Sequence, residues 1–148
     1  MHAARDPTAS EDDPGASSRS RAAMAAYLDA SLGGGRYGDH LAPDVTFTAM
    51  ETGEVTRGRE AVVGLIDHLH KQAFAASPAV KSLAVVGDRA AVEAEFVGTH
   101  VGEFAGIAPT GRRVRVPCAV AYDLTGDAIV AVRRYLPLDA LVRQLRDA

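Results

Sequence analysis

The pattern of hydrophobic and polar residues changes its period near residue 80. Before that point apolar residues recur at helical spacing, which predicts helices over about residues 20–32 and 59–75, with a strand at about 44–50 between them. Gly33-Gly34-Gly35 should end the first helix, because glycine adopts the backbone angles that a helix stop requires. Pro78 blocks continuation of the second helix.

After residue 80 the period becomes that of strands. Four strands are predicted, at Val80–Val86, Arg89–Phe104, Val114–Leu124 and Ala128–Leu136. Most of their connections are short enough for antiparallel hairpins. A last helix is predicted over about 138–146. Helices followed by a run of neighbouring strands predict an α+β fold rather than a parallel α/β sheet.

The N-terminal segment has a different composition from the rest of the chain. Residues 1–18 are mostly Ala, Ser, Pro, Asp and Glu, with almost nothing to bury. This predicts a disordered N-terminal tail, which leaves 19–148 as a single domain. A hydrophobic fraction of 47% in a chain of 148 residues is enough for one core of that size.

Charge and cysteine content narrow the classes of partner and compartment. The formal net charge of −3 argues against a nucleic-acid partner, and Arg112-Arg113-Val114-Arg115 is interpreted as a strand with exposed arginines. No apolar run is long enough to span a membrane, and no apolar signal core is visible. The single cysteine, Cys118, excludes an internal disulfide. We therefore expect a cytoplasmic protein without a nucleic-acid or membrane partner.

The segment from Gly98 to Gly111 reads GTHVGEFAGIAPTG. It resembles the GTHxGxxxGxxPTG signature of the SnoaL-like polyketide cyclases, a family of the nuclear-transport-factor-2-like and ketosteroid-isomerase-like superfamily. Three further segments resemble that family in the same order and extend the likeness over roughly residues 21–146: Pro43-Asp44-Val45-Thr46-Phe47, Arg57-Gly58-Arg59-Glu60-Ala61-Val62 and Leu141-Val142-Arg143-Gln144-Leu145. His100, inside the signature, is expected to be a structural turn residue.

The resemblance implies a strongly bent, mostly antiparallel sheet that helices close into a cone-shaped barrel with one deep pocket. It also implies acid–base chemistry without a cofactor, and pairing into a homodimer. Aldol-type members carry an Asp–His pair on the last two long strands. Matching without gaps places Arg134 at the aspartate position and Val120 at the histidine position, so aldol ring closure through that pair is not expected.

His70 is the first candidate for acid–base chemistry. It lies four residues after Ile66 and four before Phe74, so the apolar stripe of the second helix carries it inward. A buried imidazole can exchange protons near neutral pH, although a hydrogen-bonded core histidine fits the same spacing. His68 and His70 are two residues apart and point in different directions on a helix, so no metal site is expected.

Glu93 and Glu95 share one face of the strand at 89–104. Two carboxylates on a face that lines a cavity can divide acid and base roles. The same alternation fits a face that meets water or a partner subunit. The pattern leaves these two interpretations equally open.

Glu51 and Arg134 are the remaining charged candidates. Glu51 follows the first strand, either at a pocket rim or in a solvated turn. Arg134 has apolar neighbours on its strand and needs a counter-charge if it is buried, so it either pairs with a glutamate or binds a substrate oxygen. We predict that Glu93 and Arg134 point into one cavity and interact directly or through a water.

The resemblance, taken together with these residues, implies two alternative functions. The first is a cofactor-free enzyme that uses acid–base chemistry to cyclise, isomerise or open an epoxide in a hydrophobic, polyketide-like intermediate. The second is a ligand-binding or dimerisation module without catalysis. The predicted catalytic residues are His70, Glu93, Arg134 and Glu51, and the predicted substrate-binding residues are Phe47, Thr48, Phe74, Glu95, Cys118, Tyr122 and Leu136.

Overall fold

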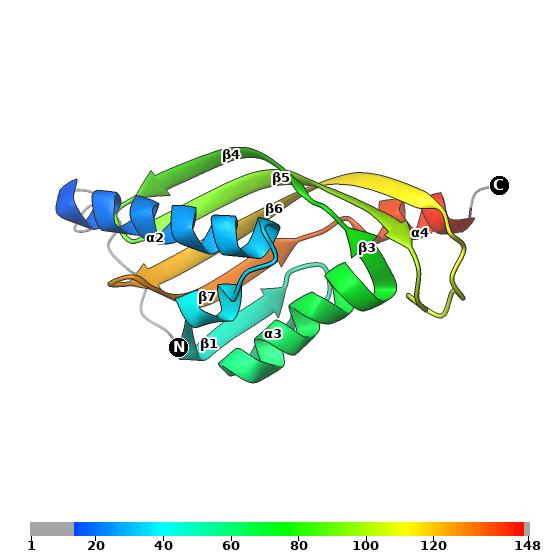
Figure 1. Cartoon of the computed structure of the whole chain (residues 1–148), viewed down its shortest axis with the longest axis horizontal. Coiled ribbons are helices and arrows are strands. Elements are labelled where there is room, and N and C mark those ends of the chain that lie inside the picture. The colour runs from blue at the N-terminus through cyan, green and yellow to red at the C-terminus, as the bar shows by residue number, and fades with distance from the viewer. Residues whose placement is uncertain (1–13, 147–148) are drawn as a thin grey trace.

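The computed structural model describes residues 14–146 (Figure 1). A strongly curved sheet of seven strands packs on its inner face against helices, so the predicted α+β fold with a bent sheet is confirmed. The helices are α2 (Pro14–Leu32), α3 (Arg59–Asp67) and α4 (Leu138–Arg146), together with the short 3₁₀ turn η1 (Tyr37–His40) and the π-helical segment η2 (His68–Ala73).

The strands follow the order β2-β1-β7-β6-β5-β3, and β4 also pairs with β5. Their bounds are β1 (Leu41–Ala49), β2 (Glu54–Arg57), β3 (Phe74–Ala76), β4 (Ala79–Val86), β5 (Arg89–His100), β6 (Arg113–Thr125) and β7 (Ala128–Tyr135). The pairs in this described part of the chain are antiparallel, apart from the parallel pair β1–β7. That parallel pair sets Ala49 opposite Arg134, so the turn that follows β1 begins beside Arg134.

Alternation along β5 separates the two faces of the sheet. Val92 and Ala94 are buried, whereas Glu93 between them is exposed. The buried face packs against Met24 of α2 and Val62 of α3 in one core cluster. Complete burial of a side chain such as Met24 stabilises the fold by about 1.5–3 kcal/mol. We call this helix-covered side the inner face and the other side the outer face.

The segment 98–111 is held in place by His100. The His100 ring is fully buried, and its Nδ1 accepts a hydrogen bond from the Thr110 backbone N–H at 3.1 Å and lies 2.9 Å from Thr110 Oγ1. A Cβ atom on Gly102 would overlap the carbonyl oxygen of Gln72, so glycine is required where this segment passes η2. These contacts agree with the structural role expected for His100.

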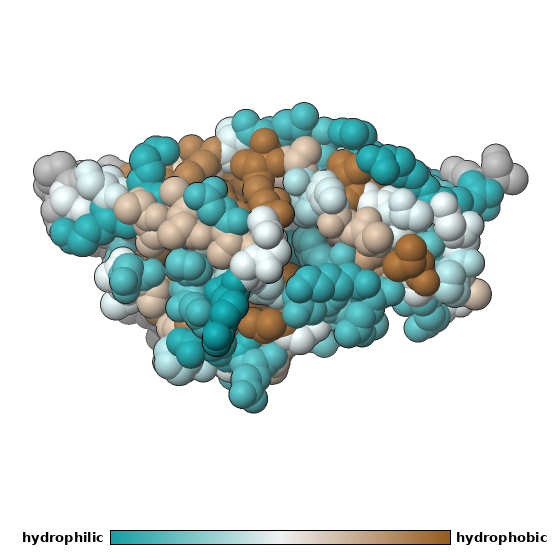
Figure 2. Space-filling model, viewed as in Figure 1, coloured by the Kyte–Doolittle hydropathy of each residue, from teal (hydrophilic) through white to brown (hydrophobic). Residues whose placement is uncertain are grey.

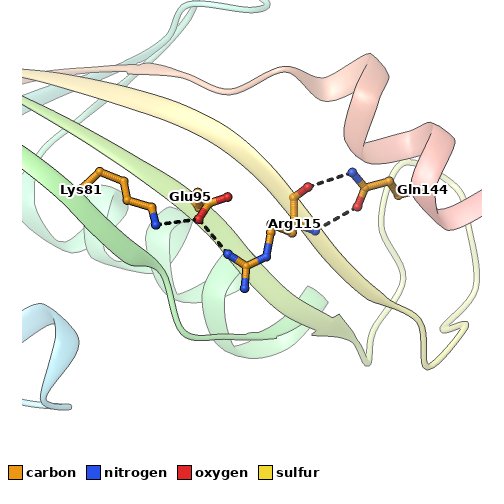
Figure 3. Close-up of polar contacts among 4 residues, drawn as sticks. All are labelled: Lys81, Glu95, Arg115 and Gln144. Carbon is orange, nitrogen blue, oxygen red and sulfur yellow. Dashed lines mark hydrogen bonds and ion pairs between the residues drawn. The ribbon is translucent and has the colours of Figure 1, made fainter.

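Helix α4 covers the part of β6 that β7 does not reach. β7 pairs only with Ala119–Thr125, which leaves the backbone of Arg115 without a strand on that side. Gln144 takes that place: its Oε1 accepts from the Arg115 N–H and its Nε2 donates to the Arg115 carbonyl, both at 2.9 Å (Figure 3). Leu141 and Leu145 on the same helix are buried.

The predicted bounds of both long helices need correction. α2 begins at Pro14 rather than near Ser20, so residues 14–18, which composition assigned to the tail, are helical. Ser17 Oγ accepts a hydrogen bond from the Gly87 N–H at 2.8 Å, which ties this first part of α2 to the sheet. The rest of the predicted tail lies outside the described residues. The second helix widens into η2 and ends at Ala73, because β3 pairs with β5.

Candidate functional site

A cavity of about 110 Å³ lies between the inner face of the sheet, the C-terminal half of α2 and the α3–η2 segment. Its wall is mainly apolar, and its polar side chains are Tyr27, Ser31, His70, Cys118, Tyr122 and Arg134. Two apolar members of the lining, Leu32 and Val80, are exposed, at 50% and 37%. The cavity therefore opens where the end of α2 approaches β4, and Figure 2 shows apolar side chains gathered between these two elements.

His70 lies in the wall of this cavity, on η2. Its ring meets the edge of Phe96, with centroids 5.5 Å apart and planes at 84°. Burial, together with the charge of Arg134, lowers the pKa of His70 to about 4. The imidazole is therefore neutral at pH 7, and a neutral imidazole can accept a proton.

Arg134 lies in the same wall and pairs with Glu51. Arg134 Nη2 donates to Glu51 Oε1 at 3.0 Å, and the side chains are only 18% and 11% exposed. The guanidinium also lies over the ring of Phe47, 5.3 Å from its centroid. Glu51 is therefore paired and largely buried rather than in a solvated turn, and the guanidinium of Arg134 lies beside an apolar cavity.

The parallel β1–β7 pair explains this contact. Ala49 stands opposite Arg134, and the Met50 N–H donates to the Arg134 carbonyl at 2.9 Å. The turn that follows β1 therefore brings Glu51 beside the Arg134 side chain, although the two residues are 83 apart in sequence.

The predicted interaction between Glu93 and Arg134 is wrong. Glu93 is exposed on the outer face, where Ser82 Oγ donates to its Oε1 at 3.4 Å. Glu95 lies on the same face, and its Oε1 binds Lys81 Nζ at 3.0 Å and Arg115 Nη1 at 2.7 Å (Figure 3). The polar face of β5 is therefore the one that the described helices leave uncovered, and neither carboxylate lines the cavity.

The lysine and arginine beside Glu95 lower the pKa of its carboxyl, because they favour its charged form. The Glu95 carboxylate therefore belongs to a surface ion pair on the outer face, and it does not act as a base for a ligand in the cavity.

The predicted substrate-binding residues divide between the cavity wall and other places. Those in the wall are Phe47, Cys118, Tyr122 and Leu136. Thr48 follows Phe47 on β1 and is absent from the wall, as strand alternation requires. Phe74 is fully buried in a neighbouring cluster, where it packs against Phe96 and Phe104.

Three polar groups in the wall are poor proton acceptors or donors at neutral pH. Burial raises the pKa of the Tyr122 hydroxyl, which is also hydrogen-bonded to Tyr27, and burial raises the pKa of Tyr27 to about 12. Burial likewise raises the pKa of the Cys118 thiol, although the charge of Arg134 partly opposes this. These groups remain protonated and suit hydrogen bonding better than proton abstraction.

Several wall residues were not among the predicted site residues. Ile66 and Leu69 belong to the apolar stripe of the second predicted helix, and Tyr27 belongs to that of the first, so periodicity contained a signal for them. The sequence contained no signal that Pro78 and Val80 line the cavity, because they reach it only through the pairing of β4 with β5. No group of three or more potential metal ligands, and no helix able to cross a membrane, occurs within residues 14–146.

Several solved structures are similar to this chain in fold. A protein of 19% identity from Jannaschia sp. CCS1, a presumed SnoaL-like polyketide cyclase, superimposes with a TM-score of 0.79 over 99% of each chain. AclR from Streptomyces galilaeus, a presumed hydroxylase, gives 0.74 at 22% identity over 89% of this chain and 98% of its own. A Catenulispora acidiphila protein with a ketosteroid-isomerase-like fold, solved with trimethylamine, gives 0.66 at 23% identity over 82% and 90%.

No curated protein matches the chain. The structural neighbours share the fold, but a presumed cyclase and a presumed hydroxylase among them show that the fold alone does not select a reaction. The model of the SnoaL-like polyketide cyclase family matches residues 22–145, which is most of the chain. This protein therefore belongs to the SnoaL-like polyketide cyclase family.

Proposed function

We propose that this protein is a cofactor-free enzyme that moves a proton on a hydrophobic, polyketide-like small molecule bound in the cavity. The observation that carries the proposal is the presence of neutral His70 and cationic Arg134 in the wall of one apolar cavity. An apolar pocket with a few polar groups suits a ligand of this class.

His70 acts as the base in this proposal. Its neutral imidazole removes a proton from the carbon next to a substrate carbonyl, and the electron pair of that C–H bond moves onto the carbonyl oxygen. Arg134 stabilises the resulting enolate oxygen by its charge and by a donor of its guanidinium. The imidazolium then returns the proton at another carbon, which completes an isomerisation. Alternatively, the enolate carbon attacks a second carbonyl, the C=O π electrons move onto that oxygen, and the imidazolium protonates the alkoxide, which completes a ring closure and restores neutral His70.

Glu51 is a positioning residue in this scheme. Its carboxylate binds the guanidinium at Nη2, and Arg134 Nε has no hydrogen-bond partner in the described part of the chain. The outer-face carboxylates Glu93 and Glu95 take no part, because they lie on the far side of the sheet from the cavity.

The test uses 3-cyclohexen-1-one, a one-ring ketone whose conversion to 2-cyclohexen-1-one needs only removal and return of one proton. We expect the protein to accelerate this conversion, measured by ultraviolet absorbance, and His70→Gln to lower the rate by about 100-fold or more. His68→Gln is the matched control, because His68 is exposed on the same η2 segment. The rate should fall only as the pH drops toward about 4, where His70 takes up a proton.

The second function, a ligand-binding module without catalysis, is the outcome if the ketone binds but converts no faster than in buffer.

The exposed outer face supports one more part of the proposal: two copies of the chain pair through it as a homodimer, which is the arrangement that the family resemblance implies. We also propose a cytoplasmic location, since the single cysteine fits a reducing compartment.

A further inference from the structure

The cavity that holds His70 is small for the ligand class proposed above. Its volume is about 110 Å³. A buried cavity of about 150 Å³ accommodates a single benzene ring. A polyketide intermediate with several rings therefore needs more room than this cavity provides.

A second hollow lies on the other side of the Glu51–Arg134 pair. Its volume is about 300 Å³, and it lies between the β1–β2 turn, α3, the segment after β5 and α4. Its wall is mostly apolar, with Leu65, Phe104, Leu138 and Val142 among its members. Arg134 lines this hollow and the His70 cavity alike, whereas Glu51 lines this hollow alone, so the Arg134 side chain, held by Glu51, is the partition between them.

The partition presents two unsatisfied polar atoms. Glu51 Oε2 and Arg134 Nε are buried, and neither has a hydrogen-bond partner in the described part of the chain. The first is an acceptor and the second a donor. A hydroxyl group can donate to a carboxylate oxygen and accept from a guanidinium N–H at the same time, so a ligand hydroxyl has the chemistry to satisfy both atoms.

The backbone beside the hollow is also unusual. Ala105, which lines it, has a φ of 51° and is followed by Gly106 at 76°, so the chain turns back on itself between Phe104 and Ile107. A positive φ is costly for a residue with a side chain. Strained backbone of this kind is concentrated at ligand sites.

We propose that the hollow beyond the Glu51–Arg134 pair is a second ligand subsite. It takes the apolar remainder of a multi-ring substrate whose reacting part lies beside His70, and the ion pair binds a hydroxyl group where the molecule passes from one hollow to the other. This inference rests on the proposed function, and it adds the size of the substrate and the position of one of its hydroxyl groups.

The test compares phenol with 1,8-dihydroxyanthraquinone by titration calorimetry. The three-ring compound should bind the unmodified protein at least about tenfold more tightly, because it fills both hollows. Val142→Trp fills the second hollow from α4 and should weaken the three-ring compound by about tenfold while leaving phenol unchanged. Arg143→Trp is the matched control, because Arg143 is exposed on the same helix.

Fluorescence adds an independent readout. The natural chain has no tryptophan, so each variant carries a single reporter. The three-ring compound should quench the indole fluorescence of the Val142→Trp variant and leave that of the Arg143→Trp variant unchanged. If Val142→Trp does not fold, Thr56→Trp places the reporter in the opposite wall of the same hollow. Anthraquinone, which lacks the hydroxyls, should bind more weakly than the dihydroxy compound, and equal binding would contradict hydroxyl recognition by the ion pair.

The outcomes separate this inference from the proposed function. Equal affinity for phenol and the three-ring compound, or a three-ring affinity unchanged by Val142→Trp, would overturn the second subsite and leave the chemistry at His70 standing. Failure of both compounds to bind the unmodified protein would contradict the proposed ligand class, and the second subsite would fall with it.

Discussion

His70 shows how the surroundings of one side chain determine its chemistry. Its pKa falls from 6.5 to about 4, first because burial disfavours the charged ring and second because Arg134 repels it. Helical periodicity predicted that this residue points inward. It contained no information on the neighbouring cation, which comes from a strand 64 residues later in the chain.

This lowered pKa predicts how stability depends on pH. Between about pH 4 and 6.5 the unfolded chain binds a proton at His70 that the folded chain does not, so stability rises with pH across that window. The contribution is complete above 6.5 and is lost as the pH falls toward 4. It amounts to about 3 kcal/mol at most. Urea unfolding across this window should show a smaller pH dependence for His70→Gln than for the natural protein.

His68→Gln serves as the control, because it makes the same replacement at an exposed histidine on the same segment. An identical pH dependence in the natural protein and His70→Gln would mean that the His70 ring titrates normally and that it is not enclosed as described.

Removing the charge of Arg134 should raise the pKa of His70. The guanidinium is the second cause of the lowered value, after burial, so Arg134→Met should raise it while leaving it below 6.5. The measurement is a proton NMR titration of the His70 ring. Because Glu51 would lose its partner, the double variant Arg134→Met with Glu51→Gln separates the loss of the cation from the gain of an unpaired carboxylate. An unchanged His70 pKa in both variants would show that Arg134 does not act on the ring.

The charged candidates show which contacts sequence reasoning could and could not find. Strand alternation correctly grouped Glu93 with Glu95, but it could not determine which face of β5 the helices cover. Turn composition favoured a solvated Glu51, whereas the parallel β1–β7 pair buries it against Arg134. A contact between residues so distant in the chain depends on sheet order, for which local patterns contain no signal.

At the scale of elements, periodicity located the long helices and strands well, because each has one face that must be buried. It failed where a tertiary contact overrides local preference. The widened turn at η2 and the short strand β3 are examples, since β3 forms only because β5 offers an edge for it. The short strand β2 was also missed, because its residues are mostly exposed and lack alternation.

Gly102 lies where the segment that follows β5 passes close to η2. A Cβ atom there would overlap the backbone carbonyl of Gln72, which has no freedom to move aside. We therefore expect Gly102→Ala to lower the free energy of unfolding by about 1–3 kcal/mol and to disturb η2, including His70. Gly64→Ala is the control: Gly64 lies in α3 with open space around its Cα, so alanine should be neutral or stabilise by up to about 1 kcal/mol.

Chemical denaturation of both glycine variants provides the measurement, and the NMR signal of the His70 ring reports whether the site is disturbed. A Gly102→Ala protein as stable as Gly64→Ala would mean that the segment 98–111 can move away from η2. In that case the close approach would not explain the glycine in the signature.

For the molecule as a whole, the helices within residues 14–146 pack on the inner face of the sheet and leave its outer face uncovered. That face carries the ion-pair network in which Glu95 binds both Lys81 and Arg115 (Figure 3). Tyr135 on β7 is 47% exposed. We expect two copies to pair through this face, so light scattering should give twice the chain mass of 15.5 kDa.

Glu95→Arg tests the position of that interface. The change places a third cation between Lys81 and Arg115, and twofold pairing would bring the same cluster from the second copy toward it. Because like charges at an interface cost several kcal/mol, the dimer should dissociate at micromolar concentrations. Glu60→Arg makes the same charge change on the exposed side of α3 and should leave the dimer intact. A monomer mass for the natural protein, or a dimer that survives Glu95→Arg, would show that copies of this chain do not associate through the outer face.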